Sequence, residues 1–239
     1  MKIYHGQTLF SLIISISLST LLMLVIIHFY SQTQQQNKEM ILRLHLQNEI
    51  QRVNQLIGKD LRRTGFRALS EKLSSNNLSL FEQDENGTAV VIAQADYEQN
   101  NSCVLFFYDL DGTGCIGTTY KGGTCIQENK NSAQKIEREL FGYRLNKKML
   151  ETRLTYKNAI NQKCNKSQCQ SYTHQPACNS GGWVDLLDEN EIEIIKLQFN
   201  WLIENTAIES KIAGRLKKYP QIEYETNIII PLLNQGINK

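Results

Sequence analysis

TLFSLIISISLSTLLMLVIIHFY, residues 8–30, is an almost wholly apolar run without a charged side chain. The charge-free interval is even longer, because no Lys, Arg, Asp or Glu lies between Gly6 and Lys38. One helix of about 20 apolar residues crosses the hydrocarbon core of a bilayer. The run therefore predicts an N-terminal membrane helix, with everything after Ser31 on one side of the membrane.

A short polar leader, MKIYHG, precedes the apolar run. A cleaved secretory signal would carry a shorter apolar core, of about 7–15 residues, followed by a small-x-small cleavage site. Residues 28–32, HFYSQ, are a poor site of that kind. The junction between Gly6 and Gln7 instead stands before the apolar run, and Lys2 favours a leader that stays inside, although one Lys is a weak topology signal.

This order of leader, glycine and apolar helix resembles the N-terminus of type IV prepilins. In that family a membrane peptidase cuts after the glycine on the cytoplasmic face and then methylates the new terminal amine. The resemblance implies processing at Gly6 and Gln7, so that the mature chain starts at Gln7. The alternative is a plain N-terminal anchor with a chance glycine, because the motif is degenerate.

Two residues depart from the prepilin pattern. Ser11 stands where the family usually has Glu, and Gln7 stands where it usually has Phe or Met. A carboxylate in hydrocarbon is expensive and needs a partner, which in the family is the terminal amine of a neighbouring subunit. Ser11 cannot form that ion pair, so the resemblance implies a minor subunit rather than the bulk filament subunit.

Small polar side chains recur along the apolar run at Ser11, Ser15 and Ser19. A spacing of four places them on one helix face, where small residues let membrane helices approach closely. The spacing predicts a helix-packing face. The alternative is local, because a serine hydroxyl can bond to a carbonyl of the preceding turn of its own helix.

Helical periodicity returns after a polar segment, residues 31–37. The apolar positions, which step by three and four, are Leu42, Leu46, Ile50, Val53, Ile57 and Leu61. Such a stripe predicts an amphipathic helix that ends near Thr64-Gly65. We therefore expect a leader (1–6), a transmembrane and assembly helix (7–30), its amphipathic continuation (31–69) and a β-rich globular domain (70–239).

Strand-like runs follow, and several alternate with a period of two, as half-buried antiparallel strands do. The runs are 89–93, 102–108, 141–145, 149–156, 195–201 and 222–228, whereas 132–140 and 207–213 read as short helices. The expected fold class is α+β, with a long N-terminal helix packed on an antiparallel sheet and disulfide-rich loops. The resemblance implies the same pilin-like architecture.

Further segments resemble PilW-like and PpdB-like minor pilins, the latter named for prepilin-peptidase-dependent protein B. They are DLRRTGF at 60–66, FGYRL at 141–145, LETR at 150–153, and the stretch from Cys178 to Phe199 that includes Trp183 and Leu186. The resemblance covers the chain discontinuously. It implies a minor pilin or pseudopilin that helps to start or cap a pilus.

A small basic patch is expected near the end of the long helix, formed by Lys59, Arg62, Arg63 and Arg67. It could contact DNA phosphates or an acidic partner subunit. The alternative is a solvated helix end, where cations suit the helix dipole. The formal net charge of only +2 favours this alternative.

Six cysteines lie beyond the membrane run, at Cys103, Cys115, Cys125, Cys164, Cys169 and Cys178. An even number after an export segment predicts disulfides in an oxidising compartment such as the periplasm. They form two clusters of three, so either one bridge joins the clusters or each cluster keeps a free thiol. A zinc site at Cys164, Cys169, His174 and Cys178 is a weaker alternative, because its first spacing is too long.

Asp109 and Asp111, in the sequence DLDGTG, match the opening of a calcium loop, but the later ligand positions do not follow that pattern. We expect a turn held by local hydrogen bonds, with calcium as a weak candidate and no other metal or cofactor. Motifs for nucleophilic, metal or nucleotide chemistry are missing from the sequence, and His174 is the one histidine of the predicted domain. The chain is therefore not expected to be an enzyme.

Together these features predict a minor pilin of a type IV pilus that takes part in initiating or capping assembly. A competence pilus for DNA uptake is one such machine. The alternatives are a J-like pseudopilin of type II secretion and a binding module at the pilus tip, either an adhesin or a DNA receptor. The expected partners are other minor pilins, the major pilin and the prepilin peptidase. The expected location is the inner membrane, crossed once, with a periplasmic C-terminal domain that enters the pilus.

Overall fold

The computed structural model describes residues 9–68, 74–118, 123–153, 160–180 and 182–234. The chain forms two compact units, residues 1–45 and 46–239, and each is described by itself. The expected α+β class, with a long helix followed by antiparallel sheets, is confirmed.

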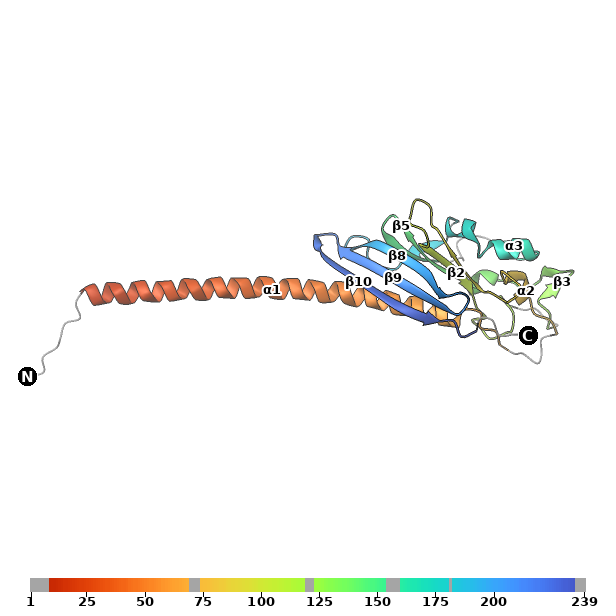
Figure 1. The fold of residues 1–239 in the computed structure, drawn as a ribbon, viewed down its shortest axis with the longest axis horizontal. Coiled ribbons are helices and arrows are strands. Elements are labelled where there is room, and N and C mark those ends of the chain that lie inside the picture. Colours follow the sequence, from red (N-terminus) through yellow and green to blue (C-terminus); the bar gives the residue numbers. More distant parts are fainter. Residues whose placement is uncertain (1–8, 69–73, 119–122, 154–159, 181, 235–239) are drawn as a thin grey trace, which may run out of the picture. The chain divides into compact units, whose positions relative to one another are not determined.

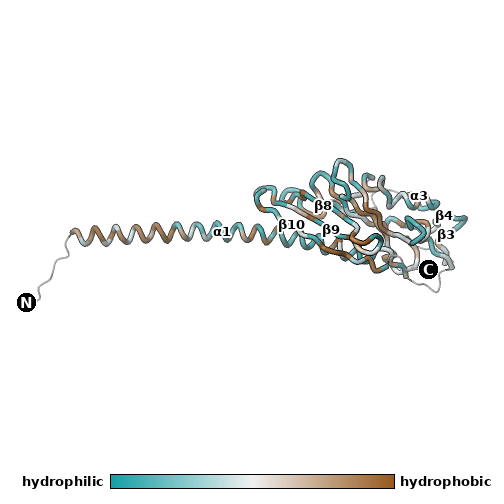
Figure 2. Tube along the Cα trace, in the orientation of Figure 1, coloured by the Kyte–Doolittle hydropathy of each residue, from teal (hydrophilic) through white to brown (hydrophobic). Residues whose placement is uncertain are grey.

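Helix α1 extends from Leu9 to Arg63. In the first unit its apolar side chains between Leu9 and Tyr30 are exposed, and Figure 2 shows this stretch in brown. Within the described residues, α1 alone is long and apolar enough to cross a membrane, by length and composition. This agrees with a single-pass anchor.

The part of α1 in the second unit is amphipathic, as the stripe predicts. Its fully buried apolar side chains are Leu46, Ile50, Val53, Ile57 and Leu61. The helix ends at Arg63 because Gly65, with a φ of 74°, adopts the left-handed conformation that commonly terminates helices.

A three-stranded antiparallel sheet packs on this part of α1. Its strands are β8 (Ile192–Ile203), β9 (Ala207–Leu216) and β10 (Tyr219–Pro231), in the order β10-β9-β8 (Figure 1). Gly58 permits the close approach, since a Cβ atom there would lie 2.7 Å from Cδ1 of Ile228. The buried hydroxyl of Ser210 is 3.1 Å from Oδ1 of Asn54 on α1.

Two expectations for this sheet were wrong. The segment 207–213 is not a helix but the first part of the central strand β9. A register shift between Ile194 and Lys196 leaves Ile195 only half-buried, so the expected alternation over 195–201 holds from Leu197 onward, and the strand itself begins at Ile192.

A second antiparallel sheet completes the domain, in the order β1-β2-β5-β6-β7. Its strands are β1 (Val90–Ala93), β2 (Cys103–Phe107), β5 (Leu140–Asn146), β6 (Met149–Arg153) and β7 (Trp183–Asp185). The smaller elements are α2 (Leu78–Phe81), the two-residue pair β3 (Ile126–Gln127) and β4 (Lys130–Asn131), η1 (Ile136–Glu139), α3 (Lys166–Ser171) and η3 (Gln175–Cys178). The helix expected over 132–140 is thus only the short 3₁₀ turn η1, and the end of the run 149–156 lies outside the described residues.

Candidate functional site

The processing junction, Gly6 and Gln7, lies outside the described residues and stays a prediction. The serine face lies in the described part of α1. The Ser15 hydroxyl donates to the Leu12 carbonyl at 3.0 Å, and the Ser19 hydroxyl donates to the Ser15 carbonyl at 2.7 Å. These donors are used inside their own helix, so helix packing at this face would rest on small side-chain size, and it stays a prediction.

The end of α1 is fixed to the five-stranded sheet by a buried phenol. The Tyr143 hydroxyl donates to Oδ2 of Asp60 at 2.5 Å, and the Tyr143 ring stacks near Phe106 with 6.1 Å between centroids. Burial first, and then the charge of Asp60, raise the pKa of Tyr143, which keeps the phenol protonated as a donor. Sequence reasoning did not find this pair, because its members are 83 residues apart.

The four predicted basic residues do not act as one group. Arg67 forms an ion pair with the nearly buried Glu82 at 3.4 Å. Arg63 lines a shallow hollow of about 430 Å³ together with Phe66 and Tyr108. Lys59, Arg62 and Arg63 are exposed cations, and contact with DNA or an acidic partner at these residues stays a prediction.

The DLDGTG turn is built around two buried carboxylates. Asp109 accepts four backbone N–H groups, those of Ala68, Gly112, Thr113 and Gly114. Glu139 joins it from η1 and accepts three more, from Leu110, Asp111 and Gly117. One ligand oxygen from each of Asp109, Asp111 and Glu139 lies within 4.8 Å of the others. Because backbone donors already occupy these oxygens, the arrangement suits a structural turn, and calcium binding stays a weak prediction.

Glu139 makes the stability of this turn dependent on pH. Burial raises its pKa from 4.5 to about 7, against the lowering effect of the three backbone donors. Glu139 therefore binds a proton more tightly in the folded state, and its contribution to the free energy of unfolding falls as the pH rises from 4.5 to 7. A shift of this size corresponds to about 3 kcal/mol.

We expect the Glu139→Gln variant to show a shallower fall in stability across this pH range, because an amide does not titrate. Urea unfolding of both proteins at a series of pH values measures it. If the free energy of unfolding depended on pH equally in the two proteins, Glu139 would not titrate in this pH range. Calcium chloride, added as a control, is expected to leave both curves unchanged.

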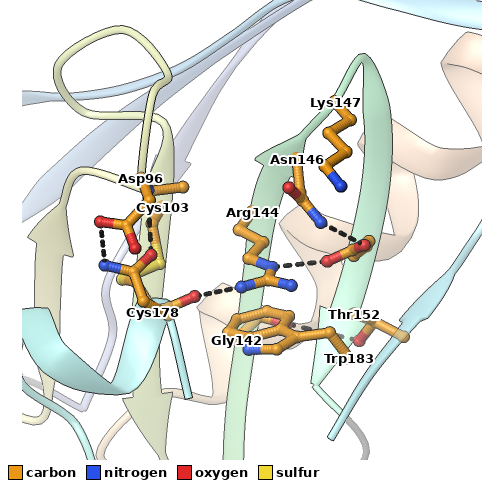
Figure 3. A network of polar contacts seen from close by, with 12 residues as sticks. Asp96, Cys103, Gly142, Arg144, Asn146, Lys147, Thr152, Cys178 and Trp183 are labelled. Carbon is orange, nitrogen blue, oxygen red and sulfur yellow. Dashed lines mark hydrogen bonds and ion pairs between the residues drawn. A yellow bond between two sulfur atoms is a disulfide. The ribbon is translucent and has the colours of Figure 1, made fainter. Parts of the chain in front are cut away.

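Figure 3 shows a second polar network, centred on Arg144 of β5. Nε of Arg144 donates to Glu151 on β6 at 2.5 Å, and Nη1 donates to the carbonyl of Cys178 at 2.5 Å. The guanidinium also lies 4.6 Å from the centre of the Trp183 ring, a cation–π distance. Gly142 leaves room for this ring, since a Cβ atom there would come within 3.0 Å of Trp183.

This network joins three of the segments that resemble PilW-like and PpdB-like minor pilins. FGYRL supplies Arg144, LETR supplies Glu151, and the stretch after Cys178 supplies Trp183. The three segments contact one another around one cation. Their arrangement positions the loop that carries Cys178 against the sheet.

Replacing Arg144 with Met is expected to lower the free energy of unfolding by about 3 kcal/mol, because it leaves the mostly buried carboxylate of Glu151 without its cation. Arg144→Lys keeps the charge but not the planar fork, and is expected to lose less. Urea unfolding followed by Trp fluorescence measures both variants. A loss in Arg144→Lys as large as that in Arg144→Met would mean that the charge is unimportant.

All six cysteines are paired, as Cys103–Cys178, Cys115–Cys125 and Cys164–Cys169. One bridge joins the two clusters, which was one of the two arrangements left open by the sequence. The zinc alternative is wrong, because three of its four ligands are used in disulfides. His174 is exposed at the start of η3, and the absence of enzymatic activity stays a prediction.

The sequence model of a family described as prepilin peptidase-dependent protein B matches residues 39–232. The chain belongs to this family. An uncharacterized protein of Haemophilus influenzae (strain ATCC 51907 / DSM 11121 / KW20 / Rd) is 55% identical over 199 residues, which is 82% of each chain. No solved structure matches.

The match to the prepilin peptidase-dependent protein B family contains the amphipathic part of α1 and both sheets, but it begins after the apolar run. It therefore supports a link to the prepilin peptidase and to pilus machinery without testing the junction at Gly6. The family name agrees with the resemblance found in DLRRTGF, FGYRL and LETR.

Proposed function

We propose that this protein is a minor pilin that initiates or caps assembly of a type IV pilus. The observation that carries the proposal is the combination of prepilin peptidase dependence in the family with one helix that is first apolar and then amphipathic. Before assembly, such a subunit would be anchored in the membrane by the apolar part of this helix. Its folded domain stays tied to the same helix.

The mechanism follows from the chemistry of α1. Ser11 offers no charge to a neighbouring terminal amine, so a filament made of this chain alone would lack that ion pair along its whole length. One or a few copies can tolerate the missing contact at an end of the filament. A cluster of minor subunits, packed through small-residue faces, would lower the barrier to adding the first major subunits.

Deletion of the gene tests the assembly role. We expect few or no surface pili by electron microscopy, with normal levels of the major pilin in the membrane and restoration by a plasmid copy. Normal pili combined with lost adhesion or lost transformation would contradict the assembly role and favour a tip binding module. Normal pili combined with lost protein secretion would favour a pseudopilin of type II secretion.

N-terminal mass spectrometry tests membership in the pilus system directly. In cells with the prepilin peptidase the mature chain is expected to start at a methylated Gln7. In cells without the peptidase it is expected to start at Met1. A chain that keeps Met1 in both strains would contradict the proposal.

A further inference from the structure

β10 forms one edge of the three-stranded sheet, and no strand among the described residues pairs with its outer side (Figure 1). The opposite edge, β8, already forms backbone hydrogen bonds with other segments of the domain. The Ile194 amide donates to the Lys148 carbonyl at 2.7 Å, and the Phe199 amide donates to the Asn101 carbonyl at 2.9 Å. In an antiparallel pair every second residue turns its N–H and C=O groups away from the partner, so this outer row of β10 has no strand partner in the described part of the chain.

The middle of this edge lacks the usual protection against pairing. Natural edge strands carry bulges, Pro or inward-pointing charges that discourage a new strand. In β10 the register shift lies before Glu223, near the start of the strand, and Pro231 is its last residue. The bulge and the proline therefore protect only the two ends of the edge. The stretch ETNIII, residues 225–230, pairs with β9 without interruption and contains neither Pro nor Lys. Such an edge can accept an added strand through backbone hydrogen bonds.

The side chains of β10 specify what kind of strand fits. On the face away from α1, Glu223 and Glu225 are about half exposed at one end. Ile229, on the same face, is 61% exposed near the other end. On the α1 side, Thr226 and Ile228 are half-buried at the rim of the core. A complementary strand would carry Lys or Arg opposite the glutamates and apolar side chains opposite Ile229.

We infer that β10 binds an extended strand from a different pilin subunit, which adds to the three-stranded sheet as its fourth strand. The inference rests on the proposed function for the class of partner. A second copy of this chain fits less well, because identical edges related by a two-fold axis pair antiparallel. β10 itself carries no Lys or Arg, so a second β10 could place no cation opposite Glu223 and Glu225.

Photo-crosslinking in piliated cells tests the contact with the full-length chain. A photoreactive amino acid at Asn227 of β10 is expected to cross-link to a strand of another pilin subunit, identified by mass spectrometry of the joined peptides. The same amino acid at Gln198 of β8, on the same face of the sheet, is the matched control and is expected not to cross-link there. Cross-linking of Asn227 to a second copy of this chain, or to no pilin subunit, would overturn the inference.

Hydrogen exchange tests the strand pairing itself. Alternate amides within residues 225–230 are expected to exchange about tenfold or more slowly in the assembled complex than in the isolated protein, since ladder hydrogen bonds protect amides. Unchanged exchange of these amides on assembly would exclude an added strand.

An edge-blocking variant connects the contact to pilus assembly. Asn227→Lys combined with Ile229→Lys is expected to reduce pili to the level of the deletion strain, while circular dichroism stays that of the wild type. Gln198→Lys is expected to assemble normally. If deletion abolishes pili but the doubly substituted chain assembles normally, the edge inference fails and the assembly role stands. If deletion leaves pili normal, the assembly role fails by itself.

Discussion

A Gly6→Val variant is expected to keep its leader and to lose all function in pilus assembly. The proposed cleavage needs a residue without a side chain before Gln7, and valine adds a branched one. The uncut chain would keep the charged side chain of Lys2 at the membrane face. A charge at that end resists movement into hydrocarbon, so the helix could not be drawn from the bilayer into a filament.

Intact-mass measurement of the purified membrane protein detects the uncut leader directly. Counting surface pili then shows whether pilus assembly is lost. Tyr4→Val is a matched control, because it puts the same side chain into the leader away from the junction and is expected to be processed. A processed Gly6→Val chain would place the cleavage elsewhere. An unprocessed chain that still supports pili would show that assembly does not require extraction of this subunit.

The Cys103–Cys178 bridge closes a loop of 75 residues. Replacing both of its cysteines with Ala is therefore expected to lower the free energy of unfolding by about 4 kcal/mol. The Cys164–Cys169 bridge spans only 5 residues, and its removal is expected to cost about 2 kcal/mol. The difference arises because a longer loop restricts the unfolded chain more. Alanine is chosen because all four cysteines are buried, and its methyl side chain adds no polar group to the core.

Urea unfolding of the three full-length proteins in detergent, without reductant, measures these losses. The wild type after reduction should be less stable than either variant. Equal losses in the two variants would mean that local packing of the sulfur atoms, and not chain restriction, sets their contribution. The Cys103–Cys178 variant should also weaken the Arg144 network, since the Cys178 carbonyl is one of its acceptors.

Several features of the candidate surfaces could be predicted because they depend on neighbours in the sequence. Leu46, Ile50 and Ile57 repeat at helical spacing, and they are buried as that spacing requires. Other features required distant partners. Glu139 stands beside Asp109 only because η1 and the end of β2 meet, and nothing near DLDGTG in the sequence indicates it.

Local patterns in the sequence were enough to predict the apolar run, the amphipathic stripe, most of the strands and the use of the six cysteines in disulfides. These patterns are local in the sequence. In the stripe and the strands, burial of one face of the element stabilises the same structure that the pattern predicts. The tertiary structure was needed to show that residues 207–213 form a strand, that Cys103 pairs with Cys178, and that no other described strand pairs with the outer side of β10. AIESKIA has no strong preference of its own, and it becomes a central strand because β8 and β10 satisfy its backbone from both sides. Pairing of distant cysteines and the order of strands depend on which segments meet in space, and that is fixed by packing of the whole domain.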